Sequence, residues 1–307
     1  MKVILDTDPG TDDALAIMMA LSSPNLQVEC ITTVGGNATV RDTTRNTLLV
    51  LAHLGVPVQS EVGGRGLPVS QGASRPLRGR YHYGYYFHGQ GGLGVRLPSP
   101  TATPYPARAP ELIAVRAASS RARITLIALG PLTNIARALR ADPGLAGRLR
   151  EVVVMGGAVE VPGNVTQHAE FNTYNDPLAA EVVFDSGVPV TLVPLDVCVE
   201  TALTRADLPW ITGGSQAAQL GRRLLYTWFG GQPDRERYEL CDPLAIVAAL
   251  QPGLLRYRQA SVAVETDDPE RLGKTTATYG DGNVKVALEV DVEGAKRLIV
   301  DLLRGDA

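Results

Sequence analysis

Residues 3–13 constrain the fold of this chain more than any other part of the sequence. Their apolar start predicts a buried strand, Pro9-Gly10 predicts a turn, and residues 14–20 have the composition of a helix. Four aspartates therefore gather where the strand ends and the helix begins: Asp6, Asp8, Asp12 and Asp13. Open α/β sheets usually bind their ligands at this edge.

These aspartates favour a metal site over simple helix capping. Capping of a first helical turn accounts for Asp12 or Asp13, but it leaves Asp6 and Asp8 unexplained. Carboxylates this close together repel one another unless a cation or a proton lies among them. Clustered oxygen ligands suit Ca²⁺ or Mg²⁺ and offer no softness for zinc or copper. We therefore predict a hard-metal site in this turn.

Strand-like and helix-like segments alternate through most of the chain, and no Pro/Ser/Gly-rich linker separates two composition regimes. We predict a single large α/β domain, residues 1–307, with a mostly parallel, Rossmann-like open sheet flanked by helices. Predicted strands cover residues 28–34, 57–62, 124–129, 151–155, 190–196, 261–265 and 284–290. Predicted helices cover residues 42–53, 110–119, 178–185 and 292–303. Residues 63–108 lack such a pattern, which indicates a functional loop or a lid.

Charge and composition exclude several classes of function. The net charge of −3, with scattered Lys and Arg, gives no basic surface for nucleic acid. No apolar run approaches the ~20 residues of a membrane span, and the N-terminus lacks the pattern of a signal peptide. Three cysteines without a C-x-x-C pair argue against a disulfide framework and a zinc ribbon. We expect a soluble cytoplasmic protein.

Other polar residues follow predicted strands and are expected at the same sheet edge. Asn37 follows two glycines, where it is either a turn residue or a ligand contact. Strand-end carbonyls near Gly130 are free to bind a cation. An Asn–Glu–Asn set supplies mixed donors and acceptors for sugar hydroxyls: Asn164, Glu170 and Asn172. Asp242, read alone, is an ordinary helix cap.

The aromatic segment 81–92 carries two histidines, His82 and His88. Its rings could stack on a planar base and its histidines could donate hydrogen bonds. The alternative is a surface loop whose tyrosines only pack against the protein surface beneath them. Of the two histidines, His88 between Phe87 and Gly89 is the better candidate for a ligand contact.

In this order the motifs resemble the inosine-uridine-preferring nucleoside hydrolase family. The matching stretches keep the family order over nearly the full length: Asp6-Thr7-Asp8-Pro9-Gly10-Thr11-Asp12-Asp13, Ile31-Thr32-Thr33-Val34-Gly35-Gly36-Asn37, Gly130-Pro131-Leu132-Thr133-Asn134, Met155-Gly156-Gly157, Asn164 with Ala169-Glu170-Phe171-Asn172, and Asp242-Pro243. One such motif is weak evidence, whereas five or six in register are strong.

The resemblance implies Ca²⁺-dependent hydrolysis of the N-glycosidic bond of ribonucleosides, in purine or pyrimidine salvage, by a homodimer or homotetramer. It implies four protein ligands for calcium: Asp8, Asp13, Asp242 and the carbonyl of Leu129. It places Asp12, Asn37 and Asn172 on the ribose ring and Asn164 and Glu170 near its 5′-hydroxyl. His88 and Asp242 also count among the substrate-binding residues. Asp8 is expected to take the proton of the attacking water, and the transition state is expected to resemble an oxocarbenium ion.

One residue departs from the family pattern. Many members carry His immediately before the Asp-Pro pair, as the acid that protonates the leaving base, and this chain has Cys241. A neutral thiol is a poor substitute. Cys241 stays a catalytic candidate beside His88, His82, a tyrosine or aromatic stacking, and the preferred base is expected to depend on residues 81–94 and 220–238.

Two other functions stay open on the sequence. Because of Cys241, the chain could be a weakly active or inactive nucleoside-binding member. A haloacid-dehalogenase-type phosphatase also begins with a strand and two aspartates one residue apart, and residues 280–283 resemble its late metal motif. Against the phosphatase, Asp12-Asp13 and the predicted sugar-binding residues would have no role. An EF-hand fails because Gly10 falls one place early and Ile17 replaces the last acidic ligand.

Overall fold

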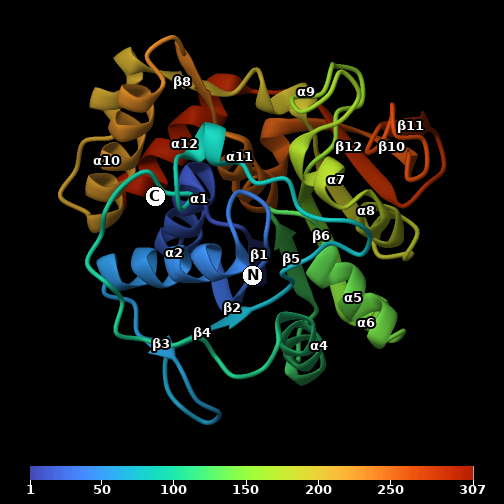
Figure 1. Ribbon diagram of the computed structural model, residues 1–307, viewed down its shortest axis with the longest axis horizontal. Coiled ribbons are helices and arrows are strands. Elements are labelled where there is room, and N and C mark those ends of the chain that lie inside the picture. Colours follow the sequence, from blue (N-terminus) through green and yellow to red (C-terminus); the bar gives the residue numbers. More distant parts are fainter. Residues whose placement is uncertain (307) are drawn as a thin grey trace.

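The computed structural model describes residues 1–306, and within them ten strands form one sheet (Figure 1). In spatial order the strands are β11 (Thr275–Tyr279), β10 (Leu255–Val264), β12 (Val284–Val290), β7 (Val190–Val193), β6 (Leu149–Met155), β5 (Ile124–Ala128), β1 (Lys2–Thr7), β2 (Gln27–Thr33), β4 (Leu67–Gln71) and β3 (Val58–Gln59). Every neighbouring pair is parallel except the two made by β10, which runs antiparallel to β11 and β12. This confirms the predicted α/β fold with a mostly parallel open sheet flanked by helices.

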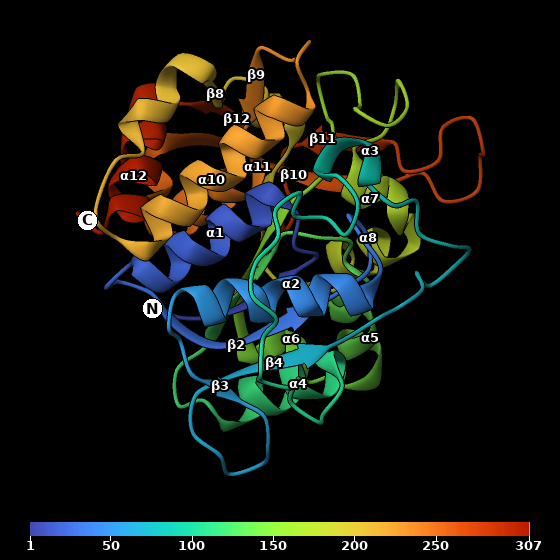
Figure 2. The ribbon, with the colours of Figure 1, turned by 60° about the vertical axis from the view of Figure 1, so that its left-hand side comes forward.

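Helices cover both faces of the sheet and bury two separate cores (Figure 2). One face carries α1 (Thr11–Ser22), α2 (Val40–His53), α10 (Gln216–Gly231), α11 (Cys241–Leu250) and α12 (Val292–Arg304). The other carries α4 (Ala109–Ser119), α5 (Thr133–Ala141), α6 (Leu145–Arg148) and α8 (Pro177–Phe184). In β1, Val3 and Leu5 enter the first core and Ile4 enters the second. A strand that is buried on both faces has a continuous apolar sequence. Residues 3–5 show this pattern, so β1 could be predicted from the sequence.

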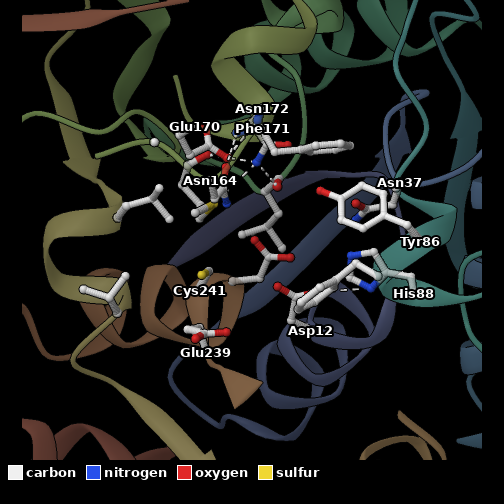
Figure 3. Close-up of a pocket in the computed structure, with 18 of the residues that line it drawn as sticks. Asp12, Asn37, Tyr86, His88, Asn164, Glu170, Phe171, Asn172, Glu239 and Cys241 are labelled. Carbon is white, nitrogen blue, oxygen red and sulfur yellow. Dashed lines mark hydrogen bonds and ion pairs between the residues drawn. The ribbon is translucent and has the colours of Figure 1, made fainter. Parts of the chain in front are cut away.

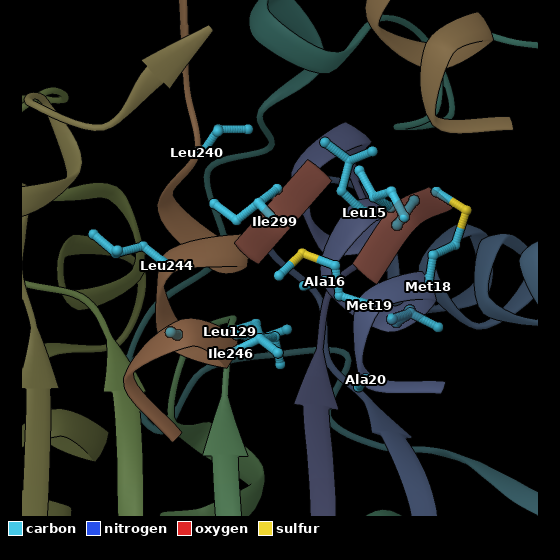
Figure 4. Packing of buried hydrophobic residues seen from close by; sticks show 14 of the residues in the cluster. Leu15, Ala16, Met18, Met19, Ala20, Leu129, Leu240, Leu244, Ile246 and Ile299 are labelled. Carbon is cyan, nitrogen blue, oxygen red and sulfur yellow. The ribbon is translucent and has the colours of Figure 1, made fainter. Parts of the chain in front are cut away.

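Helix α1 lies at the centre of the first core, packed against α10, α11 and α12 (Figure 4). Leu15, Met18 and Met19 are fully buried, and a side chain on Gly221 of α10 would press against Leu15. Close helix–helix approach of this kind fixes the axis of α1. The packing of α1 therefore fixes the position of the acidic turn at its N-terminus.

Several short elements were not predicted from the sequence. The unpatterned region 63–108 contains β4 and the one-turn helix α3 (Tyr85–His88), and the predicted strand 57–62 shortens to β3. Strands β8 (Ala202–Thr204) and β9 (Arg237–Glu239) form a small antiparallel sheet, and β11 adds an edge to the main sheet. The predicted strand 190–196 ends at Val193, because α9 (Leu195–Cys198) begins two residues later. The remaining short helices are α7 (Phe171–Asn175), η1 (Arg205–Trp210) and η2 (Pro252–Leu254).

Within residues 1–306, no helix combines the length and the apolar character that crossing a membrane requires.

The packing of α1 predicts a large cost for truncating Leu15. Leu15→Ala should lower the free energy of unfolding by about 2–5 kcal/mol, because a cavity replaces side-chain atoms that are fully buried. Urea denaturation followed by circular dichroism measures this change. Val115 on α4 is 60% exposed, so Val115→Ala should cost no more than about 0.5 kcal/mol. Equal costs for the two variants would show that α1 is not the centre of the core.

Candidate active site

The site lies at the carboxyl ends of the parallel strands, at the point where the order of the sheet reverses. Strand β1 has β2 on one side and β5 on the other, and the chain visits the β2 side first. Such a reversal leaves a crevice outside the strand ends. Most of the predicted site residues enter this crevice from the turns after β1, β2, β5 and β6. His88 enters from α3, and Cys241 and Asp242 enter from the first turn of α11.

Asp13 organises the turn after β1. Its Oδ1 accepts hydrogen bonds from the Thr7 hydroxyl (2.5 Å) and the Asp8 amide (3.1 Å). Its Oδ2 accepts from the Gly10 amide and from Asn37 Nδ2, both at 2.9 Å. Because Asn37 follows β2, this one carboxylate fixes the turn after β1 to the turn after β2.

Asp8 lies between two close backbone segments. A Cβ on Gly36 or on Gly130 would overlap its carboxylate oxygens, so only glycine allows this approach. Its Oδ2 accepts the Asn37 amide at 2.6 Å, while its buried Oδ1 has no hydrogen-bond partner among the described residues. Burial, and then the charge of Asp13, raises the pKa of Asp8 well above its ordinary value.

Three carboxylates converge close enough to share a metal ion. One oxygen each from Asp12, Asp13 and Asp242 lies within 4.8 Å of the others. Asp242 reaches the acidic turn because α11 packs beside α1, and both helices begin at this edge. Burial and the neighbouring charge of Asp13 raise the pKa of Asp12 to about 7, and the same causes raise the pKa of Asp242 well above normal. A divalent cation with oxygen ligands relieves this repulsion, so the residues fit the predicted hard metal.

The cluster differs in one member from the expected ligand set. Asp12 joins Asp13 and Asp242 within the 4.8 Å cluster. Asp8 is adjacent, since its charge contributes to the raised pKa of Asp242, and its Oδ1 is unpartnered. The Leu129 carbonyl lines the crevice and accepts a hydrogen bond of 2.8 Å from Asn172 Nδ2. The structure thus brings all four expected ligands into one neighbourhood.

A cavity of about 260 Å³ opens beside the cluster (Figure 3). Nine residues predicted for the site line it: Asp12, Asn37, His88, Leu129, Asn164, Glu170, Asn172, Cys241 and Asp242. Asp8 and Asp13 are fully buried and do not line the cavity. Asp12 and Asp242 make one side of the cavity acidic, and its walls carry the amides of Asn37, Asn164 and Asn172.

The Asn–Glu–Asn set is held by backbone hydrogen bonds. Glu170 caps α7 and accepts from the amides of Asn172 (2.7 Å), Thr173 (3.0 Å) and Gly157 (2.9 Å). Asn172 Nδ2 bonds the carbonyls of Leu129 and Met155, at the ends of β5 and β6. These bonds leave the Asn172 carbonyl oxygen available to accept a sugar hydroxyl.

His88 is a neutral hydrogen-bond donor here. Its Nδ1 accepts the Thr11 amide at 3.2 Å, so the ring proton of the neutral form lies on Nε2. Burial lowers the pKa of His88 to about 4. A Cβ on Gly10 would overlap the ring, so this glycine admits the histidine to the acidic turn. His82, the other histidine considered, is exposed against Tyr174 and does not line the cavity.

Cys241 lines the cavity at the start of α11. A hydrogen-bonding interaction with Cys198, followed by burial, raises the pKa of the Cys241 thiol well above its ordinary value. Cys241 is therefore a neutral thiol, as the sequence led us to expect, and neither it nor His88 carries a positive charge.

The cavity also contains residues that sequence reasoning did not assign to the site, among them Tyr86, Phe87, Arg235 and Glu239. Three of them lie in the segments 81–94 and 220–238 that were expected to determine base preference. Glu239 lies one residue beyond that range, and its only sequence signal is its position two residues before Cys241. Asp6, by contrast, turns away from the cavity and accepts from Thr32 Oγ1 and Asn134 Nδ2.

Comparisons with known proteins agree with this geometry. The family model described as inosine-uridine preferring nucleoside hydrolase matches residues 3–297. Uridine nucleosidase 1 of Arabidopsis thaliana is 34% identical over 310 residues, covering 95% of this chain and 90% of the relative. The pyrimidine-specific ribonucleoside hydrolase RihA of Salmonella typhi is 35% identical over 315 residues, covering 99% of this chain and 98% of the relative.

Solved structures are also similar over nearly the full length. The plant nucleoside hydrolase PpNRh1 superposes with a TM-score of 0.90 at 32% identity, covering 99% of this chain and 98% of that one. A purine-preferring ribonucleoside hydrolase from Gardnerella vaginalis gives the same TM-score and the same coverage at 28% identity.

The carboxylate cluster predicts that calcium stabilises the fold. Thermal unfolding should shift to higher temperature with added CaCl₂ and return with chelator. At a concentration one hundred times the Kd, the gain in free energy of unfolding is about 2.7 kcal/mol. Asp242→Asn should lose most of this gain because it removes one of the three clustered carboxylates. Asp281→Asn is a matched control, since Asp281 is an exposed aspartate outside the cluster. An identical calcium shift in both variants would contradict the metal site.

Proposed function

The chain belongs to the inosine-uridine preferring nucleoside hydrolase family, and on that premise we propose that it uses calcium to hydrolyse ribonucleosides to ribose and free base. The observation that carries the proposal is the convergence of Asp12, Asp13 and Asp242 beside a cavity lined by Asn and Glu side chains. Oxygen-only donors of this kind suit calcium. The Asn and Glu groups suit the hydroxyls of a sugar.

Calcium, when bound by Asp8, Asp13, Asp242 and the Leu129 carbonyl, would supply a Lewis acid that acidifies the attacking water and orients the ribose hydroxyls. Asp8 then acts as the base. Its Oδ1 is the carboxylate oxygen without a partner, and Gly36 and Gly130 leave no room for the side chain to turn away.

The remaining polar residues hold the sugar. We assign Asp12, Asn37 and Asn172 to the ribose ring and Asn164 and Glu170 to the 5′-hydroxyl. Breaking the glycosidic bond places positive charge on the ribose, and the acidic side of the cavity stabilises that charge. Both Asn37 and Asn172 are fixed by hydrogen bonds to the site itself, so little reorganisation is needed on binding.

The leaving base must be stabilised without a cationic acid. His88 is neutral because burial lowers its pKa to about 4, and Cys241 is a neutral thiol. The neutral donors that remain are His88 Nε2–H, the Cys241 thiol and the hydroxyl of Tyr86, and Arg235 adds a guanidinium that can donate hydrogen bonds without giving up its proton. Tyr86 and Phe87 offer aromatic faces for stacking. We propose that these groups share the activation that a histidine before Asp-Pro performs elsewhere in the family.

Pyrimidine ribonucleosides are our proposed substrates. The two relatives at 34% and 35% identity are named as a uridine nucleosidase and a pyrimidine-specific ribonucleoside hydrolase. A homodimer or homotetramer in the cytoplasm, working in nucleoside salvage, remains the proposal that follows from the family resemblance. The phosphatase alternative loses support, because its motif at 280–283 precedes β12 and so lies at the opposite edge of the parallel strands.

Asp8→Asn should abolish turnover of every nucleoside. An amide cannot take a proton from water, so kcat/KM should fall by about a thousandfold or more. Release of free base from uridine, cytidine, inosine, adenosine and guanosine, with and without chelator, measures the loss. Unfolding temperature is the control for folding. Appreciable turnover by this variant on any one nucleoside would remove Asp8 from its role as base, and an inert wild-type protein would favour the nucleoside-binding alternative.

Cys241→Ala should affect only the part of the cavity that binds the leaving nucleobase. We expect the ratio of kcat/KM between uridine and inosine to change by about tenfold, since the thiol lines the cavity without holding the sugar. The same panel of nucleosides measures it, with Cys30→Ala, a buried cysteine of the second core, as the matched control. An equal loss of kcat/KM on all nucleosides would show instead that Cys241 acts on the ribose or on the metal site.

A further inference from the structure

The cavity contains a single permanently charged cation. Among the described residues that line it, Arg235 is the only lysine or arginine, and it lies in the segment between α10 and β9. His88 also lines the cavity, but its Nδ1 accepts the Thr11 amide at 3.2 Å and so carries no proton. A guanidinium, by contrast, stays protonated in proteins. Arg235 is therefore the one fixed positive charge that these lining residues offer to a ligand.

Two sets of contacts hold Arg235 against α3. Its guanidinium carbon lies over the ring of Phe87, 5.3 Å from the ring centre, which is within the range of a cation–π interaction. Its backbone amide donates to the Gln232 carbonyl at 3.1 Å, and Gln232 Nε2 donates to the Tyr86 carbonyl at 2.8 Å. Tyr86 and Phe87 both line the cavity and form its aromatic wall. These contacts therefore place the guanidinium at the aromatic wall.

The aromatic wall lies where the nucleobase would project. Figure 3 shows Tyr86 across the cavity from Asn164 and Glu170. Under the proposed function, Asn164 and Glu170 hold the 5′-hydroxyl of the ribose. The base is attached to the ribose carbon on the other side of the ring oxygen, so it would point away from these two residues and toward the aromatic wall. Arg235 would then lie beside the base and not beside the sugar.

The guanidinium is oriented by the protein but not neutralised by it. Arg235 is exposed, and an exposed arginine is an ordinary surface residue unless a contact such as the one with Phe87 orients it. No carboxylate in residues 1–306 forms a salt bridge with Arg235, although Glu236 is next to it in the sequence and Glu239 lines the same cavity. Its charge and its N–H donors are thus available to a ligand.

We propose that Arg235 is a catalytic residue of the hydrolysis, which stabilises the departing base as an anion. When the bond between C1′ and N1 of uridine breaks, the electron pair stays on N1 and spreads onto the two carbonyl oxygens of uracil. The attacking water forms the new bond to C1′ and gives its proton to Asp8. Arg235 donates hydrogen bonds to the uracil oxygens and keeps its own proton, so the uracil anion is protonated by solvent. The inference rests on the proposed function and assigns the charge of the leaving base to one residue.

A substrate whose leaving group needs no stabilisation tests this role. p-Nitrophenyl β-D-ribofuranoside has the same sugar as uridine, and nitrophenolate is a stable anion. We expect Arg235→Gln to lower kcat for uridine about thirtyfold with little change in KM, because the interaction forms only as the bond breaks. A donor in an enclosed site is worth about a hundredfold or more, and Arg235 is exposed. For the nitrophenyl substrate, kcat should stay within about threefold of wild type.

Two variants and one further substrate serve as controls. Arg222→Gln removes an exposed arginine on α10 that does not line the cavity, so kcat for both substrates should stay within about twofold of wild type. Arg235→Lys keeps the charge but loses the planar group that stacks on Phe87, so its kcat for uridine should fall between those of wild type and Arg235→Gln. 5-Fluorouridine nearly matches uridine in shape but gives a more stable anion, so Arg235→Gln should lose less kcat on 5-fluorouridine than on uridine.

Three results would overturn the inference while wild-type turnover upholds the proposed function. They are equal losses of kcat on uridine and on the nitrophenyl substrate, a loss confined to KM, and an unchanged kcat for uridine in Arg235→Gln. The unfolding temperature of each variant shows that it is folded. If the wild-type protein releases no base from any nucleoside, the proposed function fails, and the role of Arg235 fails with it.

Discussion

Several carboxylates are buried together at the end of β1, and their mutual repulsion is the constraint around which this protein is built. Asp8, Asp12 and Asp242 all have raised pKa values because burial removes water and each lies near other negative charges. Such a group of acids persists only if the surrounding structure prevents it from spreading apart. The hydrogen bonds to Asp13 and the glycines around Asp8 do this locally, and the fully buried helix α1 does it from behind.

The same arrangement prepares the site for its reaction. The repulsion makes a cation favourable in the cluster, and in the proposed reaction the cation and the acidic side of the cavity would both favour a sugar that gains positive charge. Metal binding would therefore recover stability that is lost in gathering the carboxylates, and it would couple folding to function. The polar residues of the cavity wall are already hydrogen-bonded to backbone groups before any ligand binds, which preorganises them.

The part of the cavity proposed to bind the nucleobase, around His88 and Cys241, has no such concentration of charge. Its histidine and its cysteine are both neutral, because His88 is buried against the Thr11 amide and Cys241 is buried beside Cys198. A charged acid close to the carboxylate cluster would also compete with a bound cation for the carboxylates. Neutral side chains at positions 88 and 241 would avoid this competition, at the cost of weaker activation of the leaving base in the proposed reaction.

The sequence by itself determined the parallel α/β fold, the acidic turn after β1 and nine of the residues that line the cavity. Local patterns carry this information, since a buried strand is a continuous apolar run and polar strand exits of a parallel sheet meet at one edge. Only the tertiary structure decided that Asp6 turns away, because it shares the face of β1 with Ile4, and that Asp242 is more than a helix cap, because α11 packs beside α1. It likewise decided the pairing of β4, β8, β9 and β11. These features arise between residues far apart in the chain, where the partner and not the local pattern sets the geometry.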